Sequence, residues 1–192
     1  MSDLTHWTYK RSHSITSGTE LTDYQVKIRV YRTEGTSAGD TVYLGSKCLA
    51  DYGDIRFVAS DDTTELSYWM ETNAGTYADF WVKVPSIIND SSIYIYYGNS
   101  SATTTSNGDT TFEFFDGFEG SSLDSGKWTV DASNGTRTVA NGLLSLSLTG
   151  GNYHNSISAS AINNSSVIFF ISATDLHPFT SPPPSKSVPI PT

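Results

Sequence analysis

The stretch DYGDIRFVASDDTTELSYWMETNAGTYADFWVKVPSIINDSSIYIYYGN, residues 51–99, decides how this chain folds. In four short segments of it, β-branched or aromatic residues occupy alternating positions, the period-two pattern of half-buried strands. The segments are Asp54–Ala59, Leu66–Glu71, Ala78–Val84 and Ser92–Tyr97. Between them lie SDDTTE, TNAGT and PSIINDSS, whose Asp, Asn, Gly, Ser and Pro residues favour turns. The stretch therefore predicts four consecutive strands.

The rest of the chain extends this pattern and shows no helical periodicity, because no capped segment of ten residues has apolar i, i+3, i+4 spacing. Further strands are expected in residues 5–16 (as an edge strand), 22–31, 41–50, 141–151, 152–162 and 165–173. The predicted fold class is all-β: an antiparallel β-sandwich of jelly-roll or immunoglobulin-like type, followed by an incomplete second β-sandwich and a Pro-rich tail.

Changes in composition suggest three regions. The tract GNSSATTTSNGD, residues 98–109, has neither apolar period nor charge run and fits a linker or surface loop, so the first domain is placed at residues 1–110. Residues 111–172 resume the strand pattern as a partial second β domain. Residues 173–192 hold six of the seven prolines and are expected to be extended or disordered, since Pro cannot donate to a sheet ladder.

Charge and cysteine content exclude several function classes. The formal net charge is -9 and the basic residues are scattered, which argues against nucleic acid or an anionic membrane as a partner. The single Cys48 excludes an internal disulfide and a thiolate zinc site, and a buried, inert thiol is expected. The sequence contains no run of about 18 apolar residues, so no membrane-spanning segment is predicted. Residues 1–13 lack the apolar core of an export signal, so none is expected in this chain.

A series of motifs runs through residues 7–103: WTYKR, YQVKI, a Cys followed by DYGDIRF, TTELSYWMET, FWVKVPSI and IYIYYGNSSA. In content and order these motifs resemble the domain of unknown function 2341 family. The resemblance implies a compact β-sandwich module that recurs in large archaeal and bacterial surface or secreted proteins. The later tract FFDGFEGSSLDSGKWTV, with VANGLLSLSL, is similar to the opening strands of a concanavalin/laminin-G-like domain.

Four aromatic residues are the candidate ligand-binding residues. By strand alternation Trp69, Trp81, Tyr94 and Tyr96 point away from the apolar faces of their segments, and together they could form an outward strip on which a sugar stacks. The alternative is that these rings pack in a two-sheet core or against a neighbouring domain.

Metal and catalytic signals are weak. Calcium needs several oxygen ligands, and acidic residues gather in the loops at 51–62 and 116–119, with Asp116 the candidate ligand by analogy with concanavalin-like domains. The spacing is not that of a known calcium loop, and acidic turn residues are the favoured explanation. No catalytic motif is present: there is no G-x-S-x-G, no H-E-x-x-H and no phosphate-binding Gly loop.

These observations predict a non-catalytic module of a cell-surface or secreted multidomain protein, serving adhesion or carbohydrate binding, with no required cofactor. Its expected partners are a glycan or other surface ligand and the neighbouring domains of a longer parent protein, and a cytoplasmic location is the alternative. Two other functions stay open: a structural spacer without ligand, and the accessory part of a polysaccharide-degrading enzyme whose catalytic domain lies elsewhere.

Overall fold

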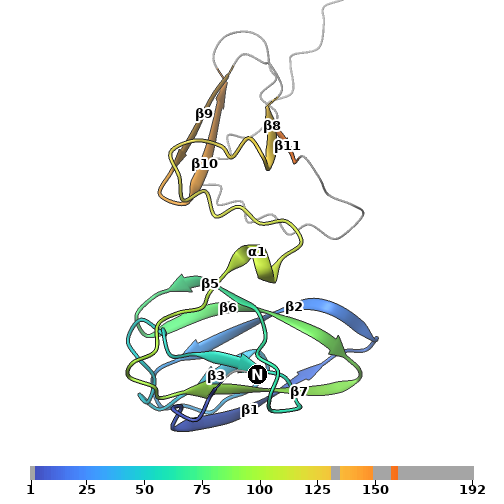
Figure 1. The fold of residues 1–192 in the computed structure, drawn as a ribbon, viewed down its shortest axis with the longest axis vertical. Coiled ribbons are helices and arrows are strands. Elements are labelled where there is room, and N and C mark those ends of the chain that lie inside the picture. Colours follow the sequence, from blue (N-terminus) through green and yellow to red (C-terminus); the bar gives the residue numbers. More distant parts are fainter. Residues whose placement is uncertain (1–2, 131–134, 149–156, 160–192) are drawn as a thin grey trace, which may run out of the picture.

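The computed structural model describes residues 3–130, 135–148 and 157–159. These residues form strands and one helix of four residues (Figure 1). The elements are β1 (Tyr9–Thr16), β2 (Leu21–Tyr31), β3 (Thr41–Tyr43), β4 (Arg56–Val58), β5 (Tyr68–Asn73), β6 (Tyr77–Ile87), β7 (Asp90–Tyr97), α1 (Gly108–Thr111), β8 (Trp128–Val130), β9 (Gly135–Ala140), β10 (Leu143–Leu148) and β11 (Ile157–Ala159). The all-β fold class is confirmed.

The first seven strands form two sheets that enclose one core. A four-stranded sheet has the order β3-β2-β6-β5, and a three-stranded sheet has the order β1-β7-β4. All pairs are antiparallel except β2 with β3, which run parallel. One buried cluster contains residues of both sheets, and the rings of Phe57 in β4 and Phe80 in β6 meet edge to face at 5.3 Å. The predicted edge strand is β1.

Strand alternation determines which side chains enter this core. Phe80, Val82 and Val84 of β6 are buried, as are Ile93 and Ile95 of β7. The residues between them lie on the outer faces of the sheets. The tract 85–92 differs from the prediction of a broad turn, because β6 continues to Ile87 and β7 begins at Asp90. Only two residues join these strands, which belong to different sheets, and the second, Asn89, takes the left-handed conformation with a φ of +53°.

The tract 98–109, which was predicted to be a linker or surface loop, is hydrogen-bonded to the sandwich. It runs along β5, the outer strand of the four-stranded sheet, where Asn107 N donates to Tyr68 O and Met70 N donates to the Ser106 hydroxyl. The backbone of β5 thus finds partners that an open sheet edge would leave to solvent or to another chain. Helix α1 follows at once, and in Figure 1 it lies over β5 and β6 on the outer side of that sheet. Sequence periodicity did not indicate this helix, because it has a single turn.

The second β region begins after α1. The described strands form two pairs, β8 with β11 and β9 with β10, and among the described residues of this region Trp128 and Val139 are apolar and buried. The β9–β10 hairpin turns at Asn141 and Gly142, which both have positive φ, as a two-residue type I′ turn demands. The predicted strand at 165–173 and the Pro-rich tail at 173–192 lie outside the described residues.

Candidate functional site

The four predicted ligand-binding aromatics do not form one strip. Trp69 and Trp81 lie on β5 and β6 of the four-stranded sheet, whereas Tyr94 and Tyr96 lie on β7 of the other sheet. Both pairs point away from the shared core, so they occupy opposite outer faces of the sandwich. The prediction of a single outward platform was therefore wrong in its geometry, although each residue was assigned to the correct side of its own strand.

Trp69 and Trp81 are directly opposite each other in the β5–β6 register and are both half-buried. The ring of Trp69 meets the rings of Phe112 and Phe115, with centroids 5.9 and 4.8 Å away, and Phe112 also lies 6.2 Å from Trp81. Phe112 and Phe115 stack on each other at 5.8 Å. Phe112 and Phe115, which follow α1, thus pack against the two tryptophans. The alternative prediction, that these rings pack against a neighbouring region of the protein, describes Trp69 and Trp81 best.

Polar groups complete this outer face. Trp81 Nε1 donates to Glu71 Oε2 at 3.0 Å, and the Lys27 ammonium binds the same oxygen at 2.8 Å. Beside them Arg29 makes two hydrogen bonds to the carboxylate of Asp79, of 2.7 and 2.8 Å. The Arg29 guanidinium lowers the pKa of the Asp79 carboxyl below its usual range. These pairs hold the face on which Phe112 and Phe115 rest.

On the opposite face, Tyr94 and Tyr96 are engaged by charged neighbours. The ammonium of Lys10 lies 4.6 Å from the centre of the Tyr94 ring and forms a 2.7 Å ion pair with Asp62. The Tyr96 hydroxyl donates to the other oxygen of Asp62 at 2.7 Å. Hydrogen bonding to Lys10 lowers the pKa of Asp62. A ligand that stacks on the ring face that Lys10 covers has to displace the lysine first.

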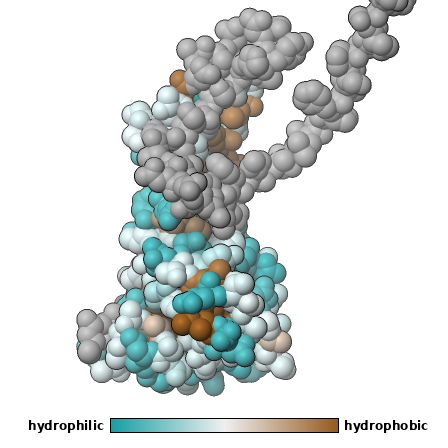
Figure 2. Space-filling view, turned by 90° about the vertical axis from the view of Figure 1, so that its right-hand side faces the viewer, coloured by the Kyte–Doolittle hydropathy of each residue, from teal (hydrophilic) through white to brown (hydrophobic). Residues whose placement is uncertain are grey.

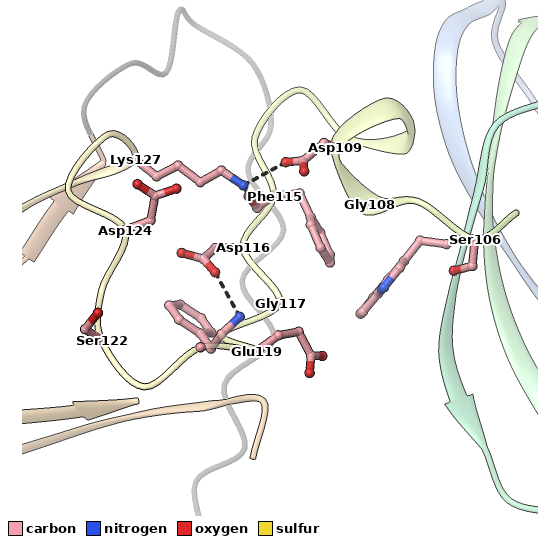
Figure 3. Close-up of a pocket in the computed structure, with 13 residues that line it drawn as sticks. Ser106, Gly108, Asp109, Phe115, Asp116, Gly117, Glu119, Ser122, Asp124 and Lys127 are labelled. Atoms are coloured by element: carbon pink, nitrogen blue, oxygen red, sulfur yellow. Dashed lines mark hydrogen bonds and ion pairs between the residues drawn. The ribbon is translucent and has the colours of Figure 1, made fainter. Parts of the chain in front are cut away.

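An open groove lies beside Trp69, where the sandwich meets the residues that follow α1. Its volume is about 420 Å³, and it is lined by Trp69, Ser106, Gly108, Asp109, Phe115, Asp116, Gly117, Phe118, Glu119, Gly120, Ser122, Asp124 and Lys127. Figure 3 shows Ser106 on the sandwich side of this groove and Asp116, Glu119, Ser122 and Asp124 on the side of the following loop. Trp69 is the only one of the predicted ligand-binding residues that lines it.

Asp116, the predicted metal ligand, lines the groove but uses its oxygens for internal hydrogen bonds. Oδ1 accepts from the backbone N–H of Phe118 at 2.8 Å, and Oδ2 accepts from Trp128 Nε1 at 2.6 Å. In the described part of the chain, no three His, Cys, Asp or Glu side chains gather where they could hold a metal ion. The role that the structure gives Asp116 is to join the start of the second β region to Trp128.

The recognisable motifs of the first region meet at one structural junction. Asp54 is fully buried, and its carboxylate accepts from the backbone N–H groups of Leu49 at 2.9 Å and Gly98 at 2.6 Å. Trp7 Nε1 donates to the carbonyl oxygen of Asp54 at 2.6 Å, and the Arg56 guanidinium lies 5.2 Å from the Trp7 ring. The motifs WTYKR, DYGDIRF and YYGN therefore carry residues that hold the fold together.

The comparison with known families bears on these motifs. Residues 51–131 match the family described as Domain of unknown function (DUF2341). The DUF2341 match begins at the loop that carries Asp54 and ends just after β8, so it includes α1 and the groove and crosses the predicted boundary at residue 110.

No curated protein and no solved structure matches the chain. The resemblance of residues 111–172 to a concanavalin/laminin-G-like domain thus gains no support from the comparisons and stays a prediction. Among the described residues, no helix has the length and apolar character needed to cross a membrane.

Sequence reasoning missed most of the groove. Phe115, Phe118, Asp124 and Lys127 belong to a tract that was assigned to a separate domain, and nothing in its spacing shows that it folds back onto β5 and β6. One signal was present: FEFFDGF places three Phe in four positions and a fourth shortly after, at the end of a polar linker. So many rings in so few residues indicate a segment that packs against an apolar partner.

Proposed function

We propose that residues 3–111 form a non-catalytic structural module of a cell-surface or secreted multidomain protein, and that this module holds the β region that follows α1 in a fixed position. The observation that carries this proposal is the contact of Phe112 and Phe115 with Trp69 and Trp81. Such ring pairs contribute about 0.5–1.5 kcal/mol each beyond the area they bury.

Hydrogen bonds on both sides of these rings support the same role. Before α1, Ser106 and Asn107 are bonded to β5, and at its end the carbonyl oxygen of Thr111 accepts from Gln25 Nε2 at 2.9 Å. After α1, Lys127 Nζ binds Asp109 at 2.7 Å and the carbonyl oxygen of Phe115 at 2.8 Å. The connection is therefore bonded at several points to the sandwich and at others to Lys127, the residue before β8, which suits a rigid joint better than a flexible linker.

The surface character fits an extracellular setting. Net charge is -9, and the face in Figure 2 is mostly teal or pale, with hydrophobic residues in one small area of the sandwich and others over the second β region. Apolar patches of limited extent are ordinary on soluble surfaces, whereas larger ones mark interaction sites. Together with the family resemblance, this favours a module in a longer surface or secreted protein over a membrane-inserted or nucleic-acid-binding one.

Amide ¹⁵N relaxation tests the proposal on the full chain. The sandwich strands and residues 112–130 should give one rotational correlation time, because a fixed joint makes them tumble together. The variant Phe115→Ala should loosen the joint and lower the order parameters of residues 112–130 alone. Two clearly different correlation times in the unmodified protein would show a flexible linker and refute the proposal.

A further inference from the structure

We propose that the groove between Trp69 and the loop at residues 116–126 binds a glycan that carries no acidic groups. This inference rests on the proposed function, because the fixed joint is what builds the groove. With a volume of about 420 Å³ it falls within the range of about 300–1,000 Å³ that is usual for ligand pockets.

The apolar wall of the groove comes from both sides of the joint. Trp69 belongs to β5, while Phe115 and Phe118 follow α1, and all three are half-buried and line the groove. The Phe115 ring contacts Trp69 and also lies against Gly108, where an added Cβ would be 2.2 Å from the ring. A wall that is fixed before binding loses little entropy when a ligand arrives.

Some polar groups of the lining are hydrogen-bonded within the protein, and others have acceptor oxygens that a ligand can reach. Asp116 is held by Trp128 and by the backbone of Phe118, and Asp109 pairs with Lys127. Glu119 and Asp124 are both exposed, and Asp124 keeps one oxygen besides the one that accepts from Gly126 N. Ionised carboxylates are acceptors only, so they suit ligands that present hydroxyl, amide N–H or ammonium donors.

Charge decides the class of glycan. Among the described residues, the lining holds the four carboxylates of Asp109, Asp116, Glu119 and Asp124 and one ammonium, that of Lys127. A uronic-acid or sulfated chain would bring like charges to this surface, whereas sugar hydroxyls and acetamido groups donate hydrogen bonds to it and sugar C–H faces pack on the rings. Neutral oligosaccharides are therefore the expected ligands.

Two glycine substitutions make a matched test. Gly120 lines the groove, and a Cβ added there would meet only ordinary contacts at 3.6 Å or more, so Gly120→Phe should fold and fill the groove. Gly18, in the turn between β1 and β2, has no atom within 4 Å of an added Cβ, so Gly18→Phe is the control of equal size. The full chain is applied to an array of glucan, xylan, mannan and N-acetylglucosamine oligomers, with oligogalacturonates as the acidic class.

The unmodified chain and Gly18→Phe should bind at least one neutral oligomer equally, and Gly120→Phe should lose about tenfold or more in affinity. Glu119→Gln should weaken the same binding. No binding to any neutral oligomer, a preference for oligogalacturonate, or binding that survives Gly120→Phe would each overturn the inference. The relaxation measurement keeps the two proposals apart, since a single correlation time without glycan binding rejects only the groove, and two correlation times reject the joint itself.

Discussion

The carboxylate of Asp54 accepts a hydrogen bond from the backbone N–H of Gly98, with 2.6 Å between Oδ2 and N. Asp54 belongs to DYGDIRF and Gly98 to YYGN, so one bond joins two motifs that are more than forty residues apart. Gly98 has a φ of +88°, and a Cβ there would lie 2.5 Å from the Tyr9 ring. The glycine is needed both for its conformation and for the close approach of Tyr9.

Replacing Asp54 by Asn should lower the free energy of unfolding by about 2–4 kcal/mol. The amide keeps one acceptor oxygen but turns an NH₂ group toward one of the two backbone N–H donors, and the site is fully buried. Urea unfolding followed by circular dichroism measures the change. Asp51→Asn is the control, since Asp51 is exposed and accepts only from Gly53 N, and it should cost under about 1 kcal/mol. Equal losses in the two variants would contradict this account of the motif.

Because of His13, the free energy of unfolding is expected to decrease in mild acid. It is 7% exposed in β1, and its pKa lies below the ordinary value of 6.5 because burial disfavours the charged ring, an effect that Asp40 partly opposes. Below about pH 6.5 the unfolded chain takes up this proton more readily than the folded one, so the stabilising contribution is complete above that pH and falls below it.

The urea midpoint should therefore drop between pH 7 and pH 5, and His13→Gln should flatten the profile in that range. The carboxyls of Asp62 and Asp79, whose pKa values are lowered, act in a separate window below about pH 4. A His13→Gln profile as steep as that of the unmodified chain would assign the effect to other groups.

Cys48 should be unreactive in the folded protein. Burial raises the pKa of its thiol from 9.0 to about 11, and the residue is 7% exposed. At about pH 8 only about one molecule in a thousand then carries the reactive thiolate. Ellman's reagent should titrate no thiol in the native chain and one thiol per chain after denaturation. Rapid reaction of the native protein at that pH would show that Cys48 is accessible.

The sequence predicts each strand far better than it predicts how the strands come together. Alternation in SYWME and IYIYYG assigned Trp69 and Tyr94 to the non-core sides of their strands, because side-chain direction follows directly from the period of two. It carried no information on which sheet each strand joins, and β5 and β7 belong to different ones. Face assignments from separate strands therefore cannot be combined into one surface without the topology.

Long-range contacts also explain why the groove could not be predicted from the sequence. Residues 98–109 read as a linker because their composition is polar and lacks a period, yet their hydrogen bonds go to the edge of β5. Which edge a polar segment covers depends on long-range pairing and leaves no local pattern. Phe112 and Phe115 were visible as apolar residues, but their partners lie far earlier in the chain: Trp81 is 31 residues before Phe112, and Trp69 is 46 residues before Phe115.

The contact of Trp69 with Phe115 is the centre of this account, and a double-mutant cycle tests it most directly. The free energy of unfolding is measured for the unmodified chain, Trp69→Ala, Phe115→Ala and the double variant. If the rings hold the following unit against the sandwich, the loss in the double variant should be about 0.5–1.5 kcal/mol smaller than the sum of the two single losses. Losses that add to within about 0.3 kcal/mol would show that the two rings do not interact in solution and would contradict the fixed joint.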